Sequence, residues 1–135
     1  MTRGYRNNNP LNMRHDNDRW QGEVVPSQDG AFKQFETMAW GYRAAFKLLH
    51  NYQKNNGCRI LSDFINRWAP PSENNTSAYV STVAKRAGLS DVSEIDTLKG
   101  DTMRAVVSAM SYVENGVEAD EADVAAGWEL FMQNR

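Results

Sequence analysis

The sequence predicts a dominantly helical α+β fold with five or six helices and one small β-hairpin. Three observations lead to this fold class. Apolar residues recur every three or four positions in several stretches that are bounded by capping or helix-ending residues. Two β-leaning runs, 20–25 and 31–35, flank the turn-forming segment PSQDG. The 135 residues, with four Trp, five Tyr and five Phe, suffice for one domain (1–135) whose core needs neither disulfides nor metal.

Composition narrows the classes of function. The formal net charge of −2 argues against a general nucleic-acid binder and against a polybasic membrane surface. Cys58 is the single cysteine, and the isolated His15 and His50 form no metal-binding pattern, so neither a metal nor another cofactor is expected. The sequence has no apolar run long enough for a bilayer and no secretory signal near its amino end. We therefore expect a protein that is made in the cytoplasm without a signal peptide and without stable membrane insertion.

The first 19 residues are rich in Asn, Arg and Asp and include Pro10, a composition that disfavours helix. They predict an ordered loop in which side-chain amides hold irregular backbone. Tyr5, Leu11 and Met13 supply apolar anchors for this loop. The hairpin that follows is not stable alone, so we expect it to pack on helices.

Four further helices are predicted by periodicity and by their end signals. Thr37 begins a helix that ends near Gly57, and a shorter helix from about Ile60 must end before the prolines at 70 and 71. Thr76 or its neighbour begins the next helix, which runs to Gly88. A final helix starts among the acidic residues 120–123, where negative charge suits the helix dipole. We assign Trp20 and Trp128 mainly to packing.

The best-defined helix covers residues 101–116. Asp101 is expected to cap its start, and Asn115-Gly116 supplies a left-handed end. Glu114 falls on the apolar face of this helix, because it follows other members of the stripe by four and seven positions. That stripe consists of Met103, Val106, Val107, Met110 and Val113.

This position has chemical consequences for Glu114. A negative charge at the carboxyl end of a helix costs about 0.3–1 kcal/mol, and partial burial penalises ionisation further, so both effects raise the pKa. A carboxyl that stays protonated near neutrality is what a general acid requires. The plain alternative is that Glu114 is an ordinary solvated glutamate that favours helix formation. The evidence of this helix alone favours that alternative.

Three segments resemble the lysozyme superfamily. RGYRNNNPLNMR (3–14), followed by W-x-G at 20–22 and F-x-x-F at 32–35, resembles small phage and prophage proteins with an RNNNPxNIR-type opening, described as virion-associated or endolysin-like muramidases. It also resembles the NNLFGIK segment of bacterial peptidoglycan glucosaminidases, such as the flagellar rod-cap hydrolase. RWAPPSENNTSAYVSTVA (67–84) is similar to their YATDPxYAxKI loop and helix, with Trp68 in place of the first Tyr and Tyr79 matching the second.

The third segment, AMSYVENG (109–116), looks like the helix of this superfamily that ends in the catalytic Glu, with Asn115 in place of the usual Ser. In the glucosaminidases this helix precedes the NNLFGIK segment, whereas here it follows the corresponding residues. The resemblance therefore implies a circularly permuted lysozyme-like fold, which is physically reasonable because the termini of domains often lie close together.

The resemblance implies cleavage of glycosidic bonds, with Glu114 as the general acid. For a second carboxylate we rank Glu23 on the hairpin before Asp29 and Glu36, although an ordinary solvated strand residue is the simpler interpretation of Glu23. If the N-acetyl group of the substrate assists, no second carboxylate is needed. Glu73 ranks below Glu114 because its loop lacks an apolar neighbourhood.

Sugars are bound by directional amides and flat aromatic rings. The asparagines could instead support loop backbone, and the aromatic residues could belong to the core. The candidates for substrate binding are Asn7, Asn8, Asn9, Asn12, Trp68, Asn74, Asn75 and Tyr79.

The expected function is therefore a phage or prophage glycosidase or lytic transglycosylase. Its partners would be peptidoglycan glycan strands and other virion or secretion components. It would act on the cell wall either in the periplasm or from a virion. One alternative is a non-catalytic virion or cell-wall-binding protein that keeps the same fold. Another is a toxin that is delivered between bacteria and uses the same chemistry.

Overall fold

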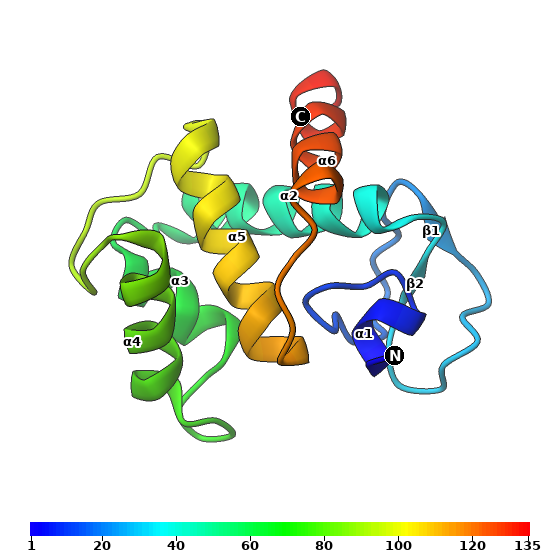
Figure 1. The fold of residues 1–135 in the computed structure, drawn as a ribbon, viewed down its shortest axis with the longest axis horizontal. Coiled ribbons are helices and arrows are strands. Elements are labelled where there is room, and N and C mark those ends of the chain that lie inside the picture. Colours follow the sequence, from blue (N-terminus) through cyan, green and yellow to red (C-terminus); the bar gives the residue numbers. More distant parts are fainter.

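Helix α5 lies at the centre of the molecule, between two groups of elements (Figure 1). The computed structural model describes all 135 residues. Helices α3 and α4 lie on one side of α5, and α1 with the hairpin lies on the other, while α6 packs across α2. The elements are α1 (Arg3–Arg6), β1 (Glu23–Val24), β2 (Gln34–Phe35), α2 (Met38–Asn56), α3 (Leu61–Trp68), α4 (Thr76–Ala87), α5 (Gly100–Asn115) and α6 (Glu121–Gln133). The predicted dominantly helical α+β class is confirmed.

Most helix ends lie where the capping residues predict them. The Thr37 hydroxyl accepts the amide of Trp40 at 3.2 Å and begins α2. The side chains of Asn75 and Asp120 accept amides in the first turns of α4 and α6. Gly57 ends α2 with a φ of 70°, a left-handed conformation that favours glycine. Local sequence signals therefore determine the lengths of these helices.

Two predictions about helices are wrong, one about the cap of α5 and one about residues 3–6. Asp101 does not cap α5, which starts one residue earlier, after Lys99, without a side-chain cap. Asp101 instead lies in the first turn and forms an ion pair with Arg104 at 2.7 Å, where its charge still suits the helix dipole. Residues 3–6, predicted as loop, form the short helix α1, because the Thr2 hydroxyl accepts the amide of Tyr5 and caps it.

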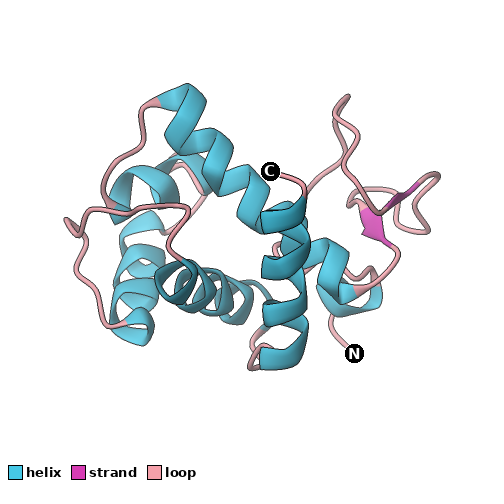
Figure 2. Ribbon diagram, turned by 90° about the horizontal axis from the view of Figure 1, so that it is seen from above, coloured by secondary structure: helices cyan, strands magenta, loops and turns pink.

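The hairpin exists, but its strands are shorter than the predicted runs. β1 and β2 are antiparallel and pair Glu23 with Phe35 and Val24 with Gln34. Pro26 has no amide hydrogen and cannot extend the ladder beyond Val24. Figure 2 shows the two strands at one end of the molecule, away from most of the helices.

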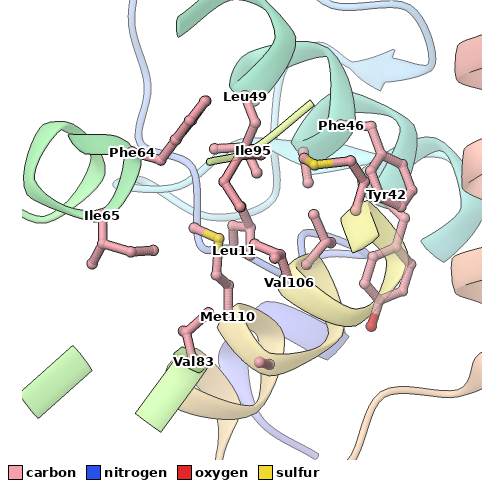
Figure 3. Packing of buried hydrophobic residues seen from close by; sticks show 14 of the residues in the cluster. Leu11, Tyr42, Phe46, Leu49, Phe64, Ile65, Val83, Ile95, Val106 and Met110 are labelled. Carbon is pink, nitrogen blue, oxygen red and sulfur yellow. The ribbon is translucent and has the colours of Figure 1, made fainter. Parts of the chain in front are cut away.

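The core is a single cluster of 26 buried apolar residues. Four members of the predicted stripe of α5 (Met103, Val106, Val107 and Met110) are buried, and the fifth, Val113, is partly buried against the same core. Leu11 from the first segment is fully buried in the same cluster, close to Met110 (Figure 3). Burial of a side chain of this size contributes about 1.5–3 kcal/mol, so the first segment is anchored to α5.

Helices α2 and α6 approach closely at Gly127. A Cβ at this position would lie 2.5 Å from the Cβ of Tyr42, so only glycine fits. The ring of Trp128 meets the ring of Phe46 edge to face, with centroids 5.0 Å apart, in agreement with the packing role expected for Trp128. None of the helices combines the length and apolar content needed to cross a bilayer.

Candidate functional site

A cavity of about 850 Å³ opens between the amino-terminal segment and the carboxyl end of α3. Its volume lies within the range of small-molecule binding sites. One wall comes from residues 12–20 and the hairpin, the opposite wall from α3 and the loop after it, and α2 and α5 close the remaining sides. The lining residues are Asn12, Met13, Arg14, His15, Asp16, Asp18, Trp20, Phe32, Leu48, Tyr52, Trp68, Ala69, Pro70, Glu73, Asn74 and Glu114.

The carboxyl group of Glu114, in the last turn of α5, meets three other elements. Its Oε2 accepts hydrogen bonds from Nε1 of Trp68 at 3.2 Å and from the hydroxyl of Tyr79 at 3.0 Å. Its Oε1 lies 3.5 Å from Nδ2 of Asn12 in the amino-terminal segment. Four residues that the sequence singled out are therefore brought together at one point, although they are up to 102 positions apart.

Burial raises the pKa of Glu114 above the ordinary 4.5 of a glutamate. The hydrogen bonds from Trp68, Tyr79 and Asn12 stabilise the ionised form and oppose this effect without cancelling it. Burial, followed by the charge of Glu114, also raises the pKa of Tyr79, which therefore remains a neutral donor. Glu114 therefore keeps its proton to higher pH than an ordinary glutamate does.

The position of the acid proton follows from the hydrogen bonds. Because Oε2 already accepts two donors, the proton of the neutral acid belongs on Oε1. Asn12 is suited to either state, since its amide can donate from Nδ2 to the carboxylate or, after rotation, accept the acid proton on Oδ1. Oδ1 of Asn12 is buried without a donor in the structure. The left-handed φ of 56° at Asn12, tolerated better by asparagine than by most residues, gives the side chain this position.

The neighbouring asparagines hold the loop rather than line the cavity. Asn7 donates to Asp29 at 3.1 Å, and Asn8 donates to the carbonyl of Phe35 at 3.1 Å. Asn9 is fully buried and donates to the carbonyls of residues 13 and 33 at 3.0 and 2.9 Å. The structure therefore does not bring Asn7, Asn8 or Asn9, predicted to bind substrate, to the cavity. The contacts of Asn8 and Asn9 match the backbone-supporting alternative, whereas Asn7 bonds to the side chains of Asp29 and Gln28.

The second predicted sugar-binding group is divided between two places. Asn74 lines the cavity and donates to the carbonyl of Pro70 at 3.2 Å. Asn75 accepts the amide of Ala78 at 3.3 Å as the cap of α4 and faces a different groove, between α3 and α4. Trp68 and Tyr79, also predicted as sugar contacts, both donate a hydrogen bond to Glu114, and of the two only Trp68 lines the cavity.

None of the three carboxylates proposed as a partner for Glu114 lines the cavity. Glu23 has a side chain only 5% exposed, which accepts the amide of Trp20 at 3.0 Å and pairs with Lys33 at 3.3 Å. Asp29 pairs with Arg3 at 2.6 Å, and this hydrogen bond lowers the pKa of Asp29 well below its usual range. Glu36 is exposed and lies outside the cavity. The structure therefore gives no geometric support to Glu23 as the second catalytic carboxylate.

Further charged residues reach the cavity, and among them sequence reasoning had considered only Glu73 as a possible acid, ranked below Glu114. Asp16, Asp18 and Glu73 contribute carboxylates, while Arg14 and His15 contribute basic groups. Asp16 pairs with the buried Lys33 at 2.9 Å. The available signal was the charged run RHDNDR at 14–19, which directly follows the Asn-rich motif.

Comparison with known proteins adds a relationship to a phage protein. No family model matches the chain. The chain is 38% identical over 117 residues to Protein P5 of Pseudoalteromonas phage PM2, and the matched region covers 84% of this chain and 71% of that protein. Identity at this level over most of both chains establishes common descent and a shared fold. The chain therefore belongs to the family of Protein P5 of Pseudoalteromonas phage PM2.

Proposed function

We propose that the chain is a peptidoglycan-cleaving glycosidase of phage or prophage type, either a hydrolase or a lytic transglycosylase. The observation that carries the proposal is Glu114, a carboxyl with a raised pKa that is held by Trp68 and Tyr79 at a cavity of sugar-binding size. The resemblance to the lysozyme superfamily supplies the substrate class, and kinship with a phage protein agrees with it.

In the proposed mechanism Glu114 is the general acid. Its proton passes from Oε1 to the glycosidic oxygen while the bond from that oxygen to the anomeric carbon breaks, a contribution worth about 10²–10⁴-fold. Water, or a hydroxyl of the sugar itself, then forms a bond to the anomeric carbon, and the proton that it releases restores the acid. Trp68 and Tyr79 then stabilise the carboxylate through their hydrogen bonds to Oε2. They provide this stabilisation without rearrangement, because both donors are already in place before the proton leaves.

The positive charge that develops at the anomeric carbon needs stabilisation from another group. The N-acetyl group of the substrate is one source, and it requires no second carboxylate from the protein. Asp18 and Glu73 are the second source in this cavity, whereas Asp16 is already neutralised by Lys33. Substitution of Asp18 and Glu73 by their amides, one at a time, distinguishes the two sources.

The junction between α5 and the chain start supports the circularly permuted relationship to lysozyme-like folds. The hydroxyl of Thr2 donates to Oδ1 of Asn115 at 2.9 Å, and Nδ2 of Asn115 donates to the carbonyl of Pro10 at 2.8 Å. The end of α5 therefore lies beside the start of the Asn-rich segment. This proximity is what a permuted order, in which α5 precedes the Asn-rich segment, would need.

The test is clearing of purified peptidoglycan by the wild-type chain and two glutamate variants. Glu114→Gln keeps the shape and the acceptor for Trp68 and Tyr79 but removes the acid, so clearing should fall at least about 100-fold. Glu129→Gln, on the exposed face of α6, is the matched control and should clear like the wild type.

Circular dichroism and thermal unfolding must show that both variants are folded. Wild-type clearing that persists unchanged in folded Glu114→Gln protein would overturn the proposal. Sedimentation with cell walls without any clearing would identify a wall-binding protein instead. Mass spectrometry of the released fragments assigns the bond that is cut and separates hydrolysis from an anhydro product.

A further inference from the structure

Arg14 is the only arginine that lines the cavity, and its guanidinium donates no hydrogen bond to another protein group. It belongs to none of the ion pairs of the structure. The bases that do form ion pairs are Arg3, Lys33, Arg59, Arg86 and Arg104. The five N–H donors of Arg14 are therefore free for a ligand that enters the cavity.

The guanidinium of Arg14 is nevertheless held in place by the aromatic ring of Phe32. It lies over the ring of Phe32, 5.0 Å from the centroid, and the backbones of Arg14 and Phe32 form an antiparallel bridge. The guanidinium of Arg3 also stacks on the ring of Phe32, 4.5 Å from its centroid, and Arg3 forms an ion pair with Asp29. Stacking on a fixed ring limits the motion of the guanidinium and leaves the N–H groups at its edges available.

Two of the carboxylates that line the cavity are already engaged, and neither of the other two, Asp18 and Glu73, forms an ion pair with Arg14. Asp16 pairs with Lys33 at 2.9 Å, and Glu114 accepts hydrogen bonds from Trp68 and Tyr79. Arg14 also acts on Glu114 through its charge, since it is one of the groups that oppose the effect of burial on the pKa of that carboxyl. Arg14 and the candidate acid thus belong to the same binding region.

We infer that Arg14 forms an anion subsite of the cavity, which binds a carboxylate of the glycan ligand and so selects acidic over neutral amino-sugar chains. The choice of ligand rests on the proposed function. Peptidoglycan carries carboxylates on the lactyl ether of its muramic acid or on the stem peptides attached there, whereas chitin-type chains carry none. A bidentate pair between guanidinium and carboxylate provides this discrimination.

The test measures, for each protein, its affinity for three tetrasaccharides at low salt by isothermal titration calorimetry. The probes are tetra-N-acetylchitotetraose, the alternating muramic acid tetrasaccharide with free lactyl carboxylates, and the same tetrasaccharide with stem peptides. All proteins carry Glu114→Gln so that no probe is cleaved. The parent should bind at least one acidic probe roughly fivefold more tightly than the neutral one, as expected for an exposed ion pair with charged hydrogen bonds. The acidic probe that shows the preference identifies the carboxylate.

Arg14→Met keeps an apolar stem over Phe32 but removes the charge, so the preference should disappear while affinity for the neutral probe stays unchanged. Arg14→Lys should keep part of the preference, which separates loss of charge from loss of fold. The matched control is Arg59→Met, since Arg59 is exposed, lies outside the cavity and pairs with Glu94; it should keep the full preference.

Equal affinity of the parent for all three probes, retention of the preference by Arg14→Met, or failure to bind any probe would overturn the inference. Failure of the proposed function has a different signature. In that case the wild-type chain clears no peptidoglycan, but the Glu114→Gln parent still prefers an acidic probe, and Arg14→Met removes this preference.

Discussion

The hydroxyl of Tyr79 in α4 lies 3.0 Å from Oε2 of Glu114 in α5, and Tyr79 is almost completely buried. This hydrogen bond stabilises the ionised form of Glu114, so its removal should raise the pKa of that carboxyl. Tyr79→Phe keeps the ring and loses only the donor. The basic limb of the pH profile of clearing should therefore move upward by about one pH unit.

Tyr112→Phe is the matched control for this measurement, because Tyr112 packs under Arg86 outside the cavity. Its pH profile should coincide with that of the wild type. A Tyr79→Phe profile that moves downward, or does not move, would show that Tyr79 has no effect on the ionisation of Glu114.

The raised pKa of Glu114 also predicts how stability depends on pH. Because the folded chain holds a proton that the unfolded chain releases, the contribution of Glu114 to stability is complete below the ordinary pKa of 4.5. It is lost as pH rises from there through the folded-state pKa. Glu114→Gln does not titrate, so the unfolding free energy of the wild type minus that of the variant should fall between pH 4 and pH 7.

The fall should amount to about 1.4 kcal/mol for each unit by which folding raises the pKa. Urea unfolding at pH 4, 5, 6 and 7 measures both proteins under the same conditions, and other titrating groups such as Asp123 cancel in the difference. A difference that is constant, or that grows in favour of the wild type with rising pH, contradicts the raised pKa.

The sequence predicted the helices well because their ends carry local signals. Thr37, Gly57 and Asp120 act through contacts within one turn, and periodicity identified the buried stripe of α5. The helix α1 was not predicted, because the capping hydroxyl of Thr2 outweighs a composition that is unfavourable for helix. Asp101 failed as a cap because acidic residues suit both the cap and the first turn, and sequence alone does not separate these positions.

For the candidate site, helical spacing singled out Glu114, and the resemblance singled out Trp68 and Tyr79. The two aromatic residues were expected as sugar contacts, and their hydrogen bonds to Glu114 were not predicted. Sequence reasoning also expected Asn7, Asn8 and Asn9 at the substrate, whereas the structure uses them within the loop, because an amide forms similar hydrogen bonds with protein groups and with sugar. Glu23 was misjudged for another reason. Its partner Lys33 is 1% exposed, and burial of a lysine in a polar loop has no sequence signature.

Lys33 should contribute to stability through the acidic groups around it. Its ammonium contacts Glu23 at 3.3 Å, Asp16 at 2.9 Å and the carbonyl of Asp18 at 2.8 Å. Lys33→Met leaves the buried carboxylate of Glu23 without its cation and should destabilise the chain by about 3–5 kcal/mol. The double variant Lys33→Met with Glu23→Leu removes both charges and should recover part of this loss.

A double-mutant cycle by urea unfolding at pH 7 measures the coupling between these two residues. Glu23→Leu alone completes the cycle. If the losses of the two single variants simply add in the double variant, Lys33 and Glu23 are not coupled, and the network does not stabilise the wall of the cavity.

Gly4 should be essential where α1 meets the end of α5. A Cβ at this position would lie 2.4 Å from Oδ1 of Asn115 and 2.8 Å from the carbonyl of Asn9. Gly4→Ala should therefore push the first segment away from α5, lower the unfolding free energy by about 1–3 kcal/mol and displace Asn12 from Glu114. Clearing per folded molecule should fall as well.

Gly127→Ala is the matched comparison for Gly4→Ala. Its Cβ would meet Tyr42 at 2.5 Å and force α2 and α6 apart, which should cost a similar amount of stability far from the cavity. Urea unfolding measures both losses, and clearing assays at a temperature where both variants are folded measure activity. Only Gly4→Ala should lose clearing, because only its clash lies between the two segments that bring Asn12 to Glu114. Equal activity of the two folded variants would show that the acid functions without close contact between the amino-terminal segment and α5.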